Sequence, residues 1–514
     1  MKKRARSLQL FTAAVLVFTS LLAGCSSGAK QAGDTGAPVG SNQQEAGSAA
    51  NLAPYEITMA FFTTNSQTQG IPEVEKAVNE ITKKKINATV KFVPISYGSY
   101  AQQTNLMVAS NEKLDLLVSG VGGTYSTHVT QGRLVAMDDL LAKYGQDITK
   151  TLDPAFLNAA KVNGKLYGIT SNRDLAADRS LTMRKDLVDK YKIDLSKLTS
   201  YNDLDSVFQT IKDKEPGITP LVLYTSSVTP VNIIANKDFD VLGDYMGVLD
   251  YENKNLKVIN MFESPKYAGM LDTVRRWYEK GYVLKDAATS KDNGSDLIKA
   301  DRAFSFLTTS KPGYAMQASR VTGKEMVELK VSEAVSNTNQ ITRFMWSIAN
   351  NSKDPARAMM FLNLMFSDKD IINLMAWGIE GRDYVKKSAN VIDYPQGVNS
   401  TSVPYGVNQG WLFGDQFKSY VFTGDPEDIY QQTDKFNKTA IKSPALGFTF
   451  DATPVKTEVA AVTSVFNQYK SGLETGTIDP KTELPQFIAK LKSAGQDKII
   501  AEKQKQLDAW AQTK

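Results

Sequence analysis

Apolar and polar residues follow two distinct periods in the part of the chain after residue 54. Short apolar runs at residues 57–62, 89–93 and 114–118 have the length and composition of buried strands. Between them, apolar side chains recur every three to four residues after Pro72 and again from Tyr100 to Val108, which predicts two amphipathic helices. Strands that alternate with helices through short links predict a parallel sheet with crossover helices.

A second block of strands and helices follows. The apolar runs predict strands near residues 181–183, 221–224, 257–260 and 303–307, and helices near residues 267–280, between Asp354 and Gly378, and at 484–494 and 497–510. Pro355 after Asp354 marks a helix start, and Gly281, Gly378 and Gly495 mark helix stops. The fold class is therefore α/β with a helical C-terminus.

The N-terminus has the pattern of an export signal. A basic head with four cations at residues 2–6 precedes an apolar run at residues 8–22. Leu22-Ala23-Gly24-Cys25 then resembles a bacterial lipobox, and Cys25 is the only cysteine. We expect residues 1–24 to be removed, Cys25 to carry a diacylglycerol, and the protein to be anchored to the outer face of the cell membrane. The alternative is an ordinary secretory signal in which Cys25 is incidental.

Composition and charge narrow the picture further. Residues 26–52 are rich in Ser, Gly, Ala and Gln without apolar periodicity, so we expect residues 25–54 to form a flexible tether. Loss of the four signal cations lowers the formal net charge from +5 to +1. A nearly neutral body does not predict nucleic acid as a partner, because that requires a clustered basic face. We expect a monomer without a metal, cofactor or disulfide.

Catalytic motifs have little support. His128 is the only histidine, so a zinc site based on histidine or a Ser-His-Asp triad would depend on it alone. We interpret it instead as a partly exposed histidine in a loop after Tyr125. After residue 54, the sequence contains neither a glycine-rich phosphate loop nor a Gly-x-Ser-x-Gly motif.

Side chains suited to sugar binding are present. A sugar presents hydroxyls around an apolar ring face, so its site needs flat aromatic rings together with carboxylates, amides or arginine. The aromatic candidates are Tyr97, Trp346, Tyr384, Tyr405 and Trp411. Each is alternatively a core residue, as we interpret Trp277 and Trp377, and we expect Trp510 to pack from the last helix.

Short segments in a fixed order along the chain resemble a known family. They include Met107-Val108-Ala109-Ser110, Gly132-Arg133-Leu134-Val135, Asn163-Gly164-Lys165-Leu166-Tyr167-Gly168, Met183-Arg184-Lys185-Asp186, Asp354-Pro355-Ala356-Arg357-Ala358, Gly378-Ile379-Glu380-Gly381, Gly447-Phe448 and Thr453-Pro454-Val455. Their order is similar to that in the extracellular solute-binding lipoproteins of ABC sugar importers (family 1), within the LplA-like or LipO-like branch. The resemblance covers nearly all of residues 55–514. Ile169-Thr170 departs from it, because many relatives carry proline after the Tyr-Gly pair.

The resemblance implies a two-lobed clamshell of the periplasmic-binding-protein type. Lobe one would comprise residues 55–170 and 330–380 and lobe two residues 171–329 and 381–514, and the crossovers would act as a hinge that closes on ligand. The implied function is the capture of an oligosaccharide for the permease subunits of an ABC importer, without catalysis. A clamshell receptor for a peptide or a uronate oligomer is the alternative, and a surface glycosidase with two carboxylates is a third possibility.

Polar candidates lie where the chain is expected to approach the cleft. Ligands of parallel sheets bind beyond the carboxyl ends of the strands, so Tyr97 and Asp115 are placed near a candidate site. Arg184 heads lobe two, and Glu380, Arg382 and Tyr384 follow a helix stop at the expected crossover. The alternatives are a turn or cap residue for Asp115, a hinge salt bridge for Arg184, and a solvated helix end or inter-lobe ion pair for the loop after Gly378.

Overall fold

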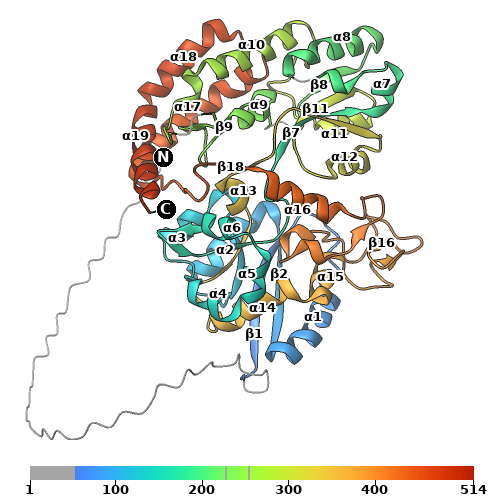
Figure 1. The fold of residues 1–514 in the computed structure, drawn as a ribbon, viewed down its shortest axis with the longest axis vertical. Coiled ribbons are helices and arrows are strands. Elements are labelled where there is room, and N and C mark those ends of the chain that lie inside the picture. The colour runs from blue at the N-terminus through green and yellow to red at the C-terminus, as the bar shows by residue number, and fades with distance from the viewer. Residues whose placement is uncertain (1–51, 199, 226–227, 253–254, 514) are drawn as a thin grey trace, which may run out of the picture. The chain divides into compact units, whose positions relative to one another are not determined.

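The computed structural model describes residues 52–513, apart from residues 199, 226, 227, 253 and 254. The signal, Cys25 and most of the tether lie outside the described residues, so what the sequence predicts for them stays a prediction. The described chain forms two lobes, each with its own sheet and hydrophobic core (Figure 1). Within this part of the chain, no helix combines the length and apolar character that crossing a bilayer requires.

The first lobe is built around a sheet whose strands run in the order β2-β1-β3-β14-β6. As predicted, β1 (Tyr55–Thr63) pairs in parallel with β2 (Ala88–Ser96) and β3 (Leu116–Ser119). β14 (Met345–Ile348) runs antiparallel to β3 and to β6 (Ile169–Thr170). The carboxyl ends of β1, β2 and β3 therefore meet at one edge of the sheet.

Helices cover this sheet. The crossover helices α1 (Ile71–Ile86) and α2 (Tyr97–Ala109) lie where the sequence predicts them. The buried face of α1 carries Val74, Val78 and Ile86, which follow helical spacing. The other helices that pack with this lobe or beside the crossings are α3 (Tyr125–Thr130), α4 (Asp138–Tyr144), α5 (Gln146–Thr151), α6 (Pro154–Ala159), α13 (Thr338–Thr342), α14 (Pro355–Ser367), α15 (Lys369–Trp377) and α16 (Ile429–Thr439).

The second lobe is built around a mixed sheet in the order β12-β7-β11-β8. β7 (Asp178–Arg184) is antiparallel to both β11 (Ala303–Ser310) and β12 (Met326–Lys330), and β8 (Thr219–Val222) is parallel to β11. The strand expected at 257–260 is reduced to one bridge between Val248 and Ile259. The helices that follow the strands of this lobe are α7 (Lys185–Lys190), α8 (Leu204–Lys214), α9 (Pro230–Asp238), α10 (Pro265–Glu279), α11 (Gly294–Lys299) and α12 (Tyr314–Thr322).

The C-terminal helices pack on the second lobe. α18 (Pro480–Ser493) and α19 (Gln496–Ala511) match the predicted pair, and Gly495 divides them. α17 (Lys456–Glu474), which the sequence analysis did not identify, precedes them. Side chains of all three helices, including Val462, Phe487 and Ile499, join the core of the β7 sheet. Short strands elsewhere in the chain are β4 (Lys161–Val162), β5 (Lys165–Leu166), β9 (Phe239–Asp240) and β10 (Leu249–Asp250).

Among the described residues, three segments pass between the lobes side by side. Ala177 and Val335 exchange two backbone hydrogen bonds of 3.0 Å. β13 (Val335–Ser336) pairs in parallel with β18 (Ile441–Lys442), and the Ile441 amide donates to Ala334 O at 2.9 Å. The expected hinge of several crossovers therefore consists of three hydrogen-bonded segments.

The third crossing lies about sixty residues later than expected. Residues 381–440 were assigned to lobe two, but Tyr405 and Phe413 belong to the same core as β1. Asp383 turns the chain back into the first lobe, because its buried carboxylate accepts the Ile379 amide at 2.8 Å and the Tyr405 amide at 3.1 Å. Gly378, with φ of +86°, permits this turn, since a Cβ there would lie 2.3 Å from Asp383 Oδ2. The strands of this segment are β15 (Val385–Lys386), β16 (Val391–Asp393) and β17 (Val421–Phe422).

Candidate functional site

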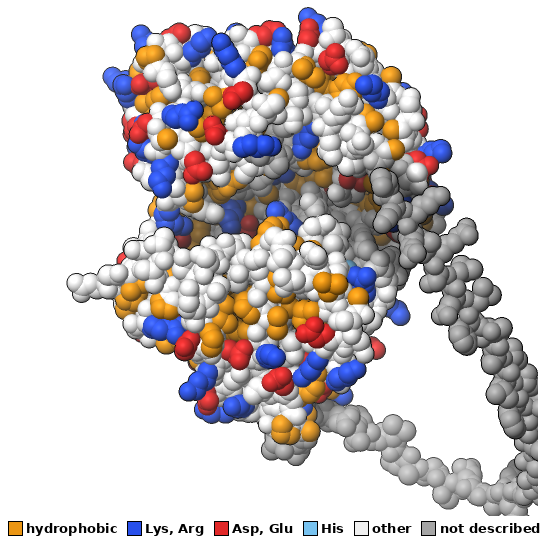
Figure 2. Space-filling view, turned by 180° about the vertical axis from the view of Figure 1, so that it is seen from behind, with side chains coloured by type: hydrophobic (Ala, Val, Ile, Leu, Met, Phe, Trp, Pro, Cys, Tyr) orange, Lys and Arg blue, Asp and Glu red, His pale blue; other side chains and the backbone are white. Residues whose placement is uncertain are grey.

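A cavity of about 750 Å³ is lined by both lobes. Seen from behind, the surface is hollowed between the upper and the lower lobe (Figure 2). The first lobe contributes residues after β3 and from α3 and α13, and the second lobe contributes residues 242–244 and residues between 448 and 459. The volume lies within the range of about 300–1,000 Å³ that is typical of sites for small organic ligands.

The lining is rich in uncharged polar side chains. Hydroxyls and amides can both donate and accept hydrogen bonds, so they suit a ligand with many hydroxyl groups. The lining residues of this kind are Ser126, Thr127, Thr130, Gln131, Thr338, Asn339, Thr342, Thr449 and Thr453. The charged lining residues are two anions and two cations, namely Asp244, Asp451, Arg343 and Lys456.

The end of β3 and the end of α13 (Thr338–Thr342) meet very closely at this cavity. Gly120, which follows β3, has φ of +86°, and a Cβ there would lie 2.0 Å from Thr342 O. Only glycine fits a backbone contact this close. The contact places Thr342 and Arg343 beside the carboxyl end of β3, where both line the cavity.

Four aromatic rings cluster beside Arg343. Phe62, near the end of β1, is fully buried and lies edge-on to Tyr97 at 5.1 Å between ring centroids. Phe344 lies 5.3 Å from Phe62 and 5.3 Å from Trp411. The Arg343 guanidinium lies 5.0 Å from the Phe344 ring centroid, which links this aromatic cluster to the cavity. Tyr97 is 43% exposed and Trp411 is half-buried, so both retain ring surface for a ligand.

Two of the predicted site residues, Tyr97 and Trp411, are thus brought together around Phe62. Tyr97 occupies the first position of α2, directly after β2, where the strand-end rule placed it. Trp411 reaches the same place from a loop far along the chain. Their position is compatible with ring stacking against a sugar.

Two aromatic candidates lie in the core instead. Trp346 is 1% exposed, its Nε1 donates to Leu412 O at 2.6 Å, and its ring lies over Phe413 at 6.1 Å. Tyr405 is 1% exposed and its hydroxyl donates to Met375 O at 2.7 Å. The expectation that these two residues face the cleft is wrong. Trp346 lies within a strand that has neighbours on both sides, and Tyr405 is buried in the first-lobe core, where its amide donates to Asp383.

Asp115 and Arg184 lie away from the cleft. Asp115 precedes β3 and so lies at the amino end of the sheet, where its carboxylate accepts the Thr58 amide at 2.8 Å and the Tyr55 hydroxyl at 2.6 Å. Burial, with the hydrogen bond to Asp115, raises the pKa of Tyr55 to about 12.

Arg184 ends β7 on the side remote from the hinge and pairs with Asp186 at 2.6 Å and Asp301 at 2.8 Å. Both side chains therefore have structural partners.

The loop after Gly378 is held by internal contacts. Glu380 pairs with Lys386 at 2.8 Å. Arg382 pairs with Asp383 at 2.6 Å and with Glu73 at 3.4 Å, both within the first lobe. Tyr384 is 6% exposed against Tyr420, and burial raises its pKa to about 12. The expected inter-lobe position of these residues is wrong, because the crossing lies near residue 440.

His128 is buried within helix α3 rather than partly exposed in a loop. Its Nε2 lies 2.9 Å from Asn105 Oδ1, which also accepts from Arg133 Nη1 at 2.6 Å. Because Asn105 Oδ1 can only accept, Nε2 carries the proton. Burial, with the nearby Arg133, lowers the pKa of His128 to about 4.

Of the remaining tryptophans, Trp277 lies in the core and Trp510 packs from the last helix, as predicted, whereas Trp377 is less buried than predicted. Trp277 is fully buried and donates to Asp205 Oδ1 at 2.6 Å. Trp377 is only half-buried, beside Phe422, and Trp510 packs edge-on against Phe448.

Several cleft residues were missed by the sequence analysis. Arg343 and the hydroxyls of α13 line the cavity, and Phe344 contacts Arg343, but in the sequence they have no local signal except that they precede a strand. The motifs around Phe448 and Thr453 were noted only as marks of a family, although both residues line the cavity. The sequence alone did not indicate that Phe448 and Thr453 lie at the cleft.

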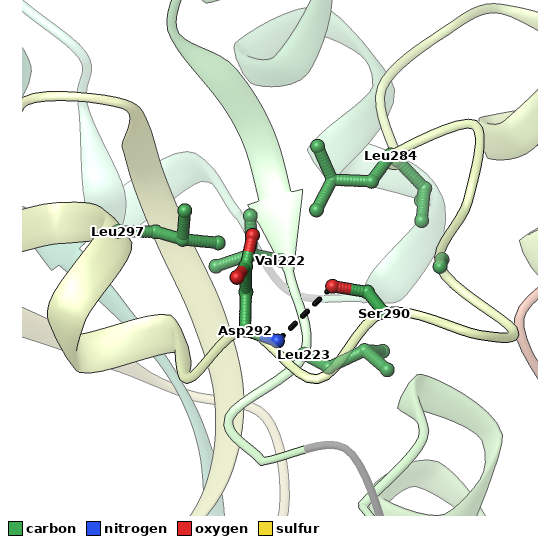
Figure 3. A pocket seen from close by; sticks show the side chains of 8 residues that line it. Val222, Leu223, Leu284, Ser290, Asp292 and Leu297 are labelled. Atoms are coloured by element: carbon green, nitrogen blue, oxygen red, sulfur yellow. Dashed lines mark hydrogen bonds between the residues drawn. The ribbon is translucent and has the colours of Figure 1, made fainter.

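A second cavity lies inside the second lobe and is much smaller. It has about 10 Å³, which is space for one water molecule at most. Apolar side chains such as Leu284 and Leu297 line it, and Ser290 Oγ accepts a hydrogen bond from the Asp292 amide at 3.1 Å (Figure 3). Among the residues that the structure describes, no group of three His, Cys, Asp or Glu side chains could hold a metal ion.

A comparison of the sequence with protein families agrees with the cleft, the two sheets and the hinge. Residues 76–382 match the family described as bacterial extracellular solute-binding protein. The chain belongs to this family. Residues 444–512 match a second family, described as a domain of unknown function (DUF3502).

Individual relatives extend the match over most of the chain. A carbohydrate ABC transporter substrate-binding protein of Streptococcus pneumoniae is 28% identical, over 88% of this chain and 91% of its own length. Lipoprotein LipO of Bacillus subtilis is 24% identical, over 61% of this chain and 64% of its own. The resemblance inferred from the order of motifs is therefore confirmed.

A solved structure shares the whole fold. The crystal structure of the N-glycan transport solute binding protein NgtS of Streptococcus pneumoniae has a TM-score of 0.80 and 28% identity, with coverage of 89% of this chain and 99% of that chain. Its complexes with Man1GlcNAc and Man5GlcNAc give TM-scores of 0.71 and 0.68. The two-lobed α/β fold predicted from the sequence is confirmed.

Proposed function

We propose that the protein captures an oligosaccharide between its lobes and delivers it to the permease of an ABC importer. The lining of the cleft carries this proposal: hydroxyl and amide side chains surround a cavity of about 750 Å³, and the aromatic cluster borders it through Arg343. Aromatic rings suit the apolar faces of sugar rings, and the polar side chains suit their hydroxyls. The streptococcal relatives, a carbohydrate ABC transporter substrate-binding protein and an N-glycan transport solute binding protein, support the same class of ligand.

A neutral saccharide fits the cleft better than the two alternatives in the clamshell class. A polyuronate would require an excess of cations, whereas Arg343 and Lys456 are balanced by Asp244 and Asp451. A peptide bound in extended form would use a free strand edge, whereas this lining offers many hydroxyl and amide side chains. We propose no catalytic step, in keeping with the solute-binding family.

Ligand binding is proposed to close the lobes about the three crossing segments. NgtS in its two glycan complexes differs more from this chain than NgtS in the other crystal structure, with TM-scores of 0.71 and 0.68 against 0.80. Since the compared protein is the same, the difference reflects conformation, as a hinge produces. Small-angle scattering with saturating glycan should show a smaller radius of gyration, and an unchanged radius would contradict closure.

We further propose that a diacylglycerol on Cys25 anchors the protein, as a monomer, to the outer face of the cell membrane. The motif Leu22-Ala23-Gly24-Cys25 and the similarity to a lipoprotein support this. Cys25→Ser should release or misprocess the protein while its melting temperature stays unchanged. Membrane fractionation decides the matter, because a mutant that stays membrane-bound at mature size would exclude the lipid anchor.

Calorimetry on the purified protein tests the ligand class. The panel is Man5GlcNAc, kestose and an alginate oligosaccharide, which represent neutral and anionic glycans. A neutral glycan at a hundredfold its dissociation constant should stabilise the folded state by ~2.7 kcal/mol. Mass spectrometry of the recovered glycan should show it intact, since hydrolysis would indicate a glycosidase. Preference for the alginate oligosaccharide would favour the uronate alternative.

A further inference from the structure

The C-terminal helix α19 contacts both second-lobe segments that line the cleft. It carries Ile499, Lys503 and Leu507 at four-residue spacing on one buried face. Leu507 packs in one cluster with Leu242 and Phe448, and both of these residues line the cavity. The cleft wall of this lobe therefore lies directly on α19.

Lys503 is the polar centre of this contact. Its side chain is 0% exposed, and its Nζ lies 2.6 Å from Asp244 Oδ1 and 3.0 Å from Gly247 O. The same Nζ lies 4.9 Å from the ring centroid of Phe450, another lining residue. A lysine is almost never fully buried unless it is paired, and here the partner faces the cleft. Burial lowers the pKa of Lys503, while Asp244 favours its charged form.

Asp244 is held through one of its two oxygens. Oδ1 accepts from Lys503 and from the Met246 amide at 2.7 Å. Both bonds that described residues donate to this carboxylate go to Oδ1, and the side chain is 31% exposed at the cavity. Oδ2 is left to accept a hydrogen bond from a ligand hydroxyl.

Gln506 holds the second lining segment. Its amide accepts from the Asp451 backbone amide and donates to Asp451 O, both at 2.9 Å. Gln504 on the same helix makes a similar pair of bonds to Val258 N at 2.7 Å and Leu256 O at 3.1 Å, but neither of those residues lines the cavity. The two glutamines form a matched pair for experiment.

We propose that Lys503 is a positioning residue for ligand recognition, which fixes the carboxylate of Asp244 so that Oδ2 receives a saccharide hydroxyl, and that Gln506 holds the Asp451 segment in register beside it. Residues 444–512, the match to the domain of unknown function, thereby supply one segment of the second-lobe wall and hold the other, residues 242–244, through α19. The inference rests on the proposed function and assigns a role to its C-terminal part.

A double-mutant cycle measured by calorimetry, with the same glycan panel, tests the inference. Lys503→Met keeps the volume of the side chain, and we expect it to bind about tenfold more weakly, as should Asp244→Asn. The double variant should bind no more weakly than either single variant, because Lys503 acts through Asp244. Gln504→Ala should keep wild-type affinity.

The outcomes separate two failures. If the wild-type protein binds no glycan of the panel, the proposed function and this inference fall together. If the wild-type protein binds and Lys503→Met binds equally well, or if the two losses simply add, the positioning role is overturned while the proposed function stands. If Lys503→Met does not fold, the glycan affinities of Gln506→Ala and Gln504→Ala are compared instead. Only Gln506→Ala should bind more weakly, so equal affinities of these two variants contradict the inference.

Discussion

The two walls of the cleft are built in different ways. The first-lobe wall lies beyond the strand ends: Gly120, which lines the cavity, directly follows β3. In the aromatic cluster beside it, Phe62 lies near the end of β1 and Tyr97 directly follows β2. The second-lobe wall consists of residues 242–244 and residues between 448 and 459, which lie some two hundred residues apart in the sequence and are joined by α19.

Sheet topology explains the difference. In the first lobe β1, β2 and β3 are parallel, so their carboxyl ends share one edge and the following loops meet there. In the second lobe β7 runs antiparallel to both neighbours, so the loops after its strands diverge and the wall needs long-range anchors. Damage to the core behind the first wall should therefore appear mainly in stability, and damage to the long-range anchors of the second wall mainly in affinity.

The largest effect is expected at the core behind the first wall. Trp346→Ala removes a side chain that is 1% exposed, and the cavity should cost about 3–5 kcal/mol of unfolding free energy. Trp277→Ala, at a fully buried position of the second lobe, is the matched variant and should cost a similar amount. Denaturant unfolding measures both. A Trp346→Ala variant with wild-type stability and weakened binding would contradict the core assignment and show that Trp346 contacts the ligand.

Acid should destabilise the first lobe through His128. Its folded pKa of about 4 lies below the ordinary value of 6.5, so between these values the unfolded chain binds more protons and stability falls as the pH falls. The loss should reach about 3 kcal/mol near pH 4. Urea unfolding at pH 7, 5.5 and 4 measures it, and His128→Gln should remove this contribution.

Glu474 of the second lobe serves as a control, because its contribution to stability should change with pH in the opposite direction to that of His128. It is 2% exposed, accepts from the Tyr267 hydroxyl at 3.2 Å and also from Thr229, and burial raises its pKa. A raised carboxyl pKa gives stability at low pH that is lost as the pH rises through the folded pKa. Glu474→Gln should therefore remove the loss of stability that begins as the pH rises above the ordinary carboxyl pKa of 4.5, and it should leave the contribution of His128 unchanged. Equal profiles for both variants would contradict the assignment of the acid loss to His128.

Local patterns account for what the sequence predicted well. The strands and helices up to β3 have clear periods, and the strand-end rule placed Tyr97 correctly. The same rule misplaced Asp115, because it precedes its strand instead of following it. Trp346 was misplaced because a central strand is buried on both faces, so its position in the strand gives no information about exposure.

Long-range contacts account for what the sequence could not predict. Gly378 signals the end of a helix, but the side to which the chain turns is decided by Asp383 and Tyr405, 22 residues apart. The second wall depends on contacts such as that between Asp451 and Gln506, 55 residues apart. Such pairs leave no periodic trace in a single sequence.

A moderate effect on affinity is expected at the aromatic cluster. Trp411→Ala removes a half-buried ring that contacts Phe344, and glycan binding should weaken about tenfold, or ~1.4 kcal/mol. Trp377→Ala removes another half-buried ring, which donates to Tyr420 O at 3.1 Å outside the cleft. It should lower stability by about 2 kcal/mol and leave affinity unchanged. Calorimetry and thermal melts on both variants decide, and a Trp411→Ala variant with normal binding would remove that residue from the site.

The smallest effect is expected at the hinge, which belongs to both walls. Lys442 of β18 pairs with Asp153 at 2.7 Å, and each side chain is about one-third exposed. Such a pair contributes less than about 1 kcal/mol and is screened by salt. Lys442→Met keeps the alkyl chain near Phe156, so the melting temperature should change little and the difference should vanish in high salt.

Lys442 is the better member of the pair to change, because Asp153 also caps α6 by accepting the Ala155 amide at 2.8 Å. Asp153→Ala should cost about 1 kcal/mol more through loss of this cap. Glycan affinity should stay within about threefold in Lys442→Met, since the backbone bonds between the crossing segments remain. A tenfold change in affinity would instead show that this ion pair sets the balance between open and closed lobes, and that neither wall alone determines binding.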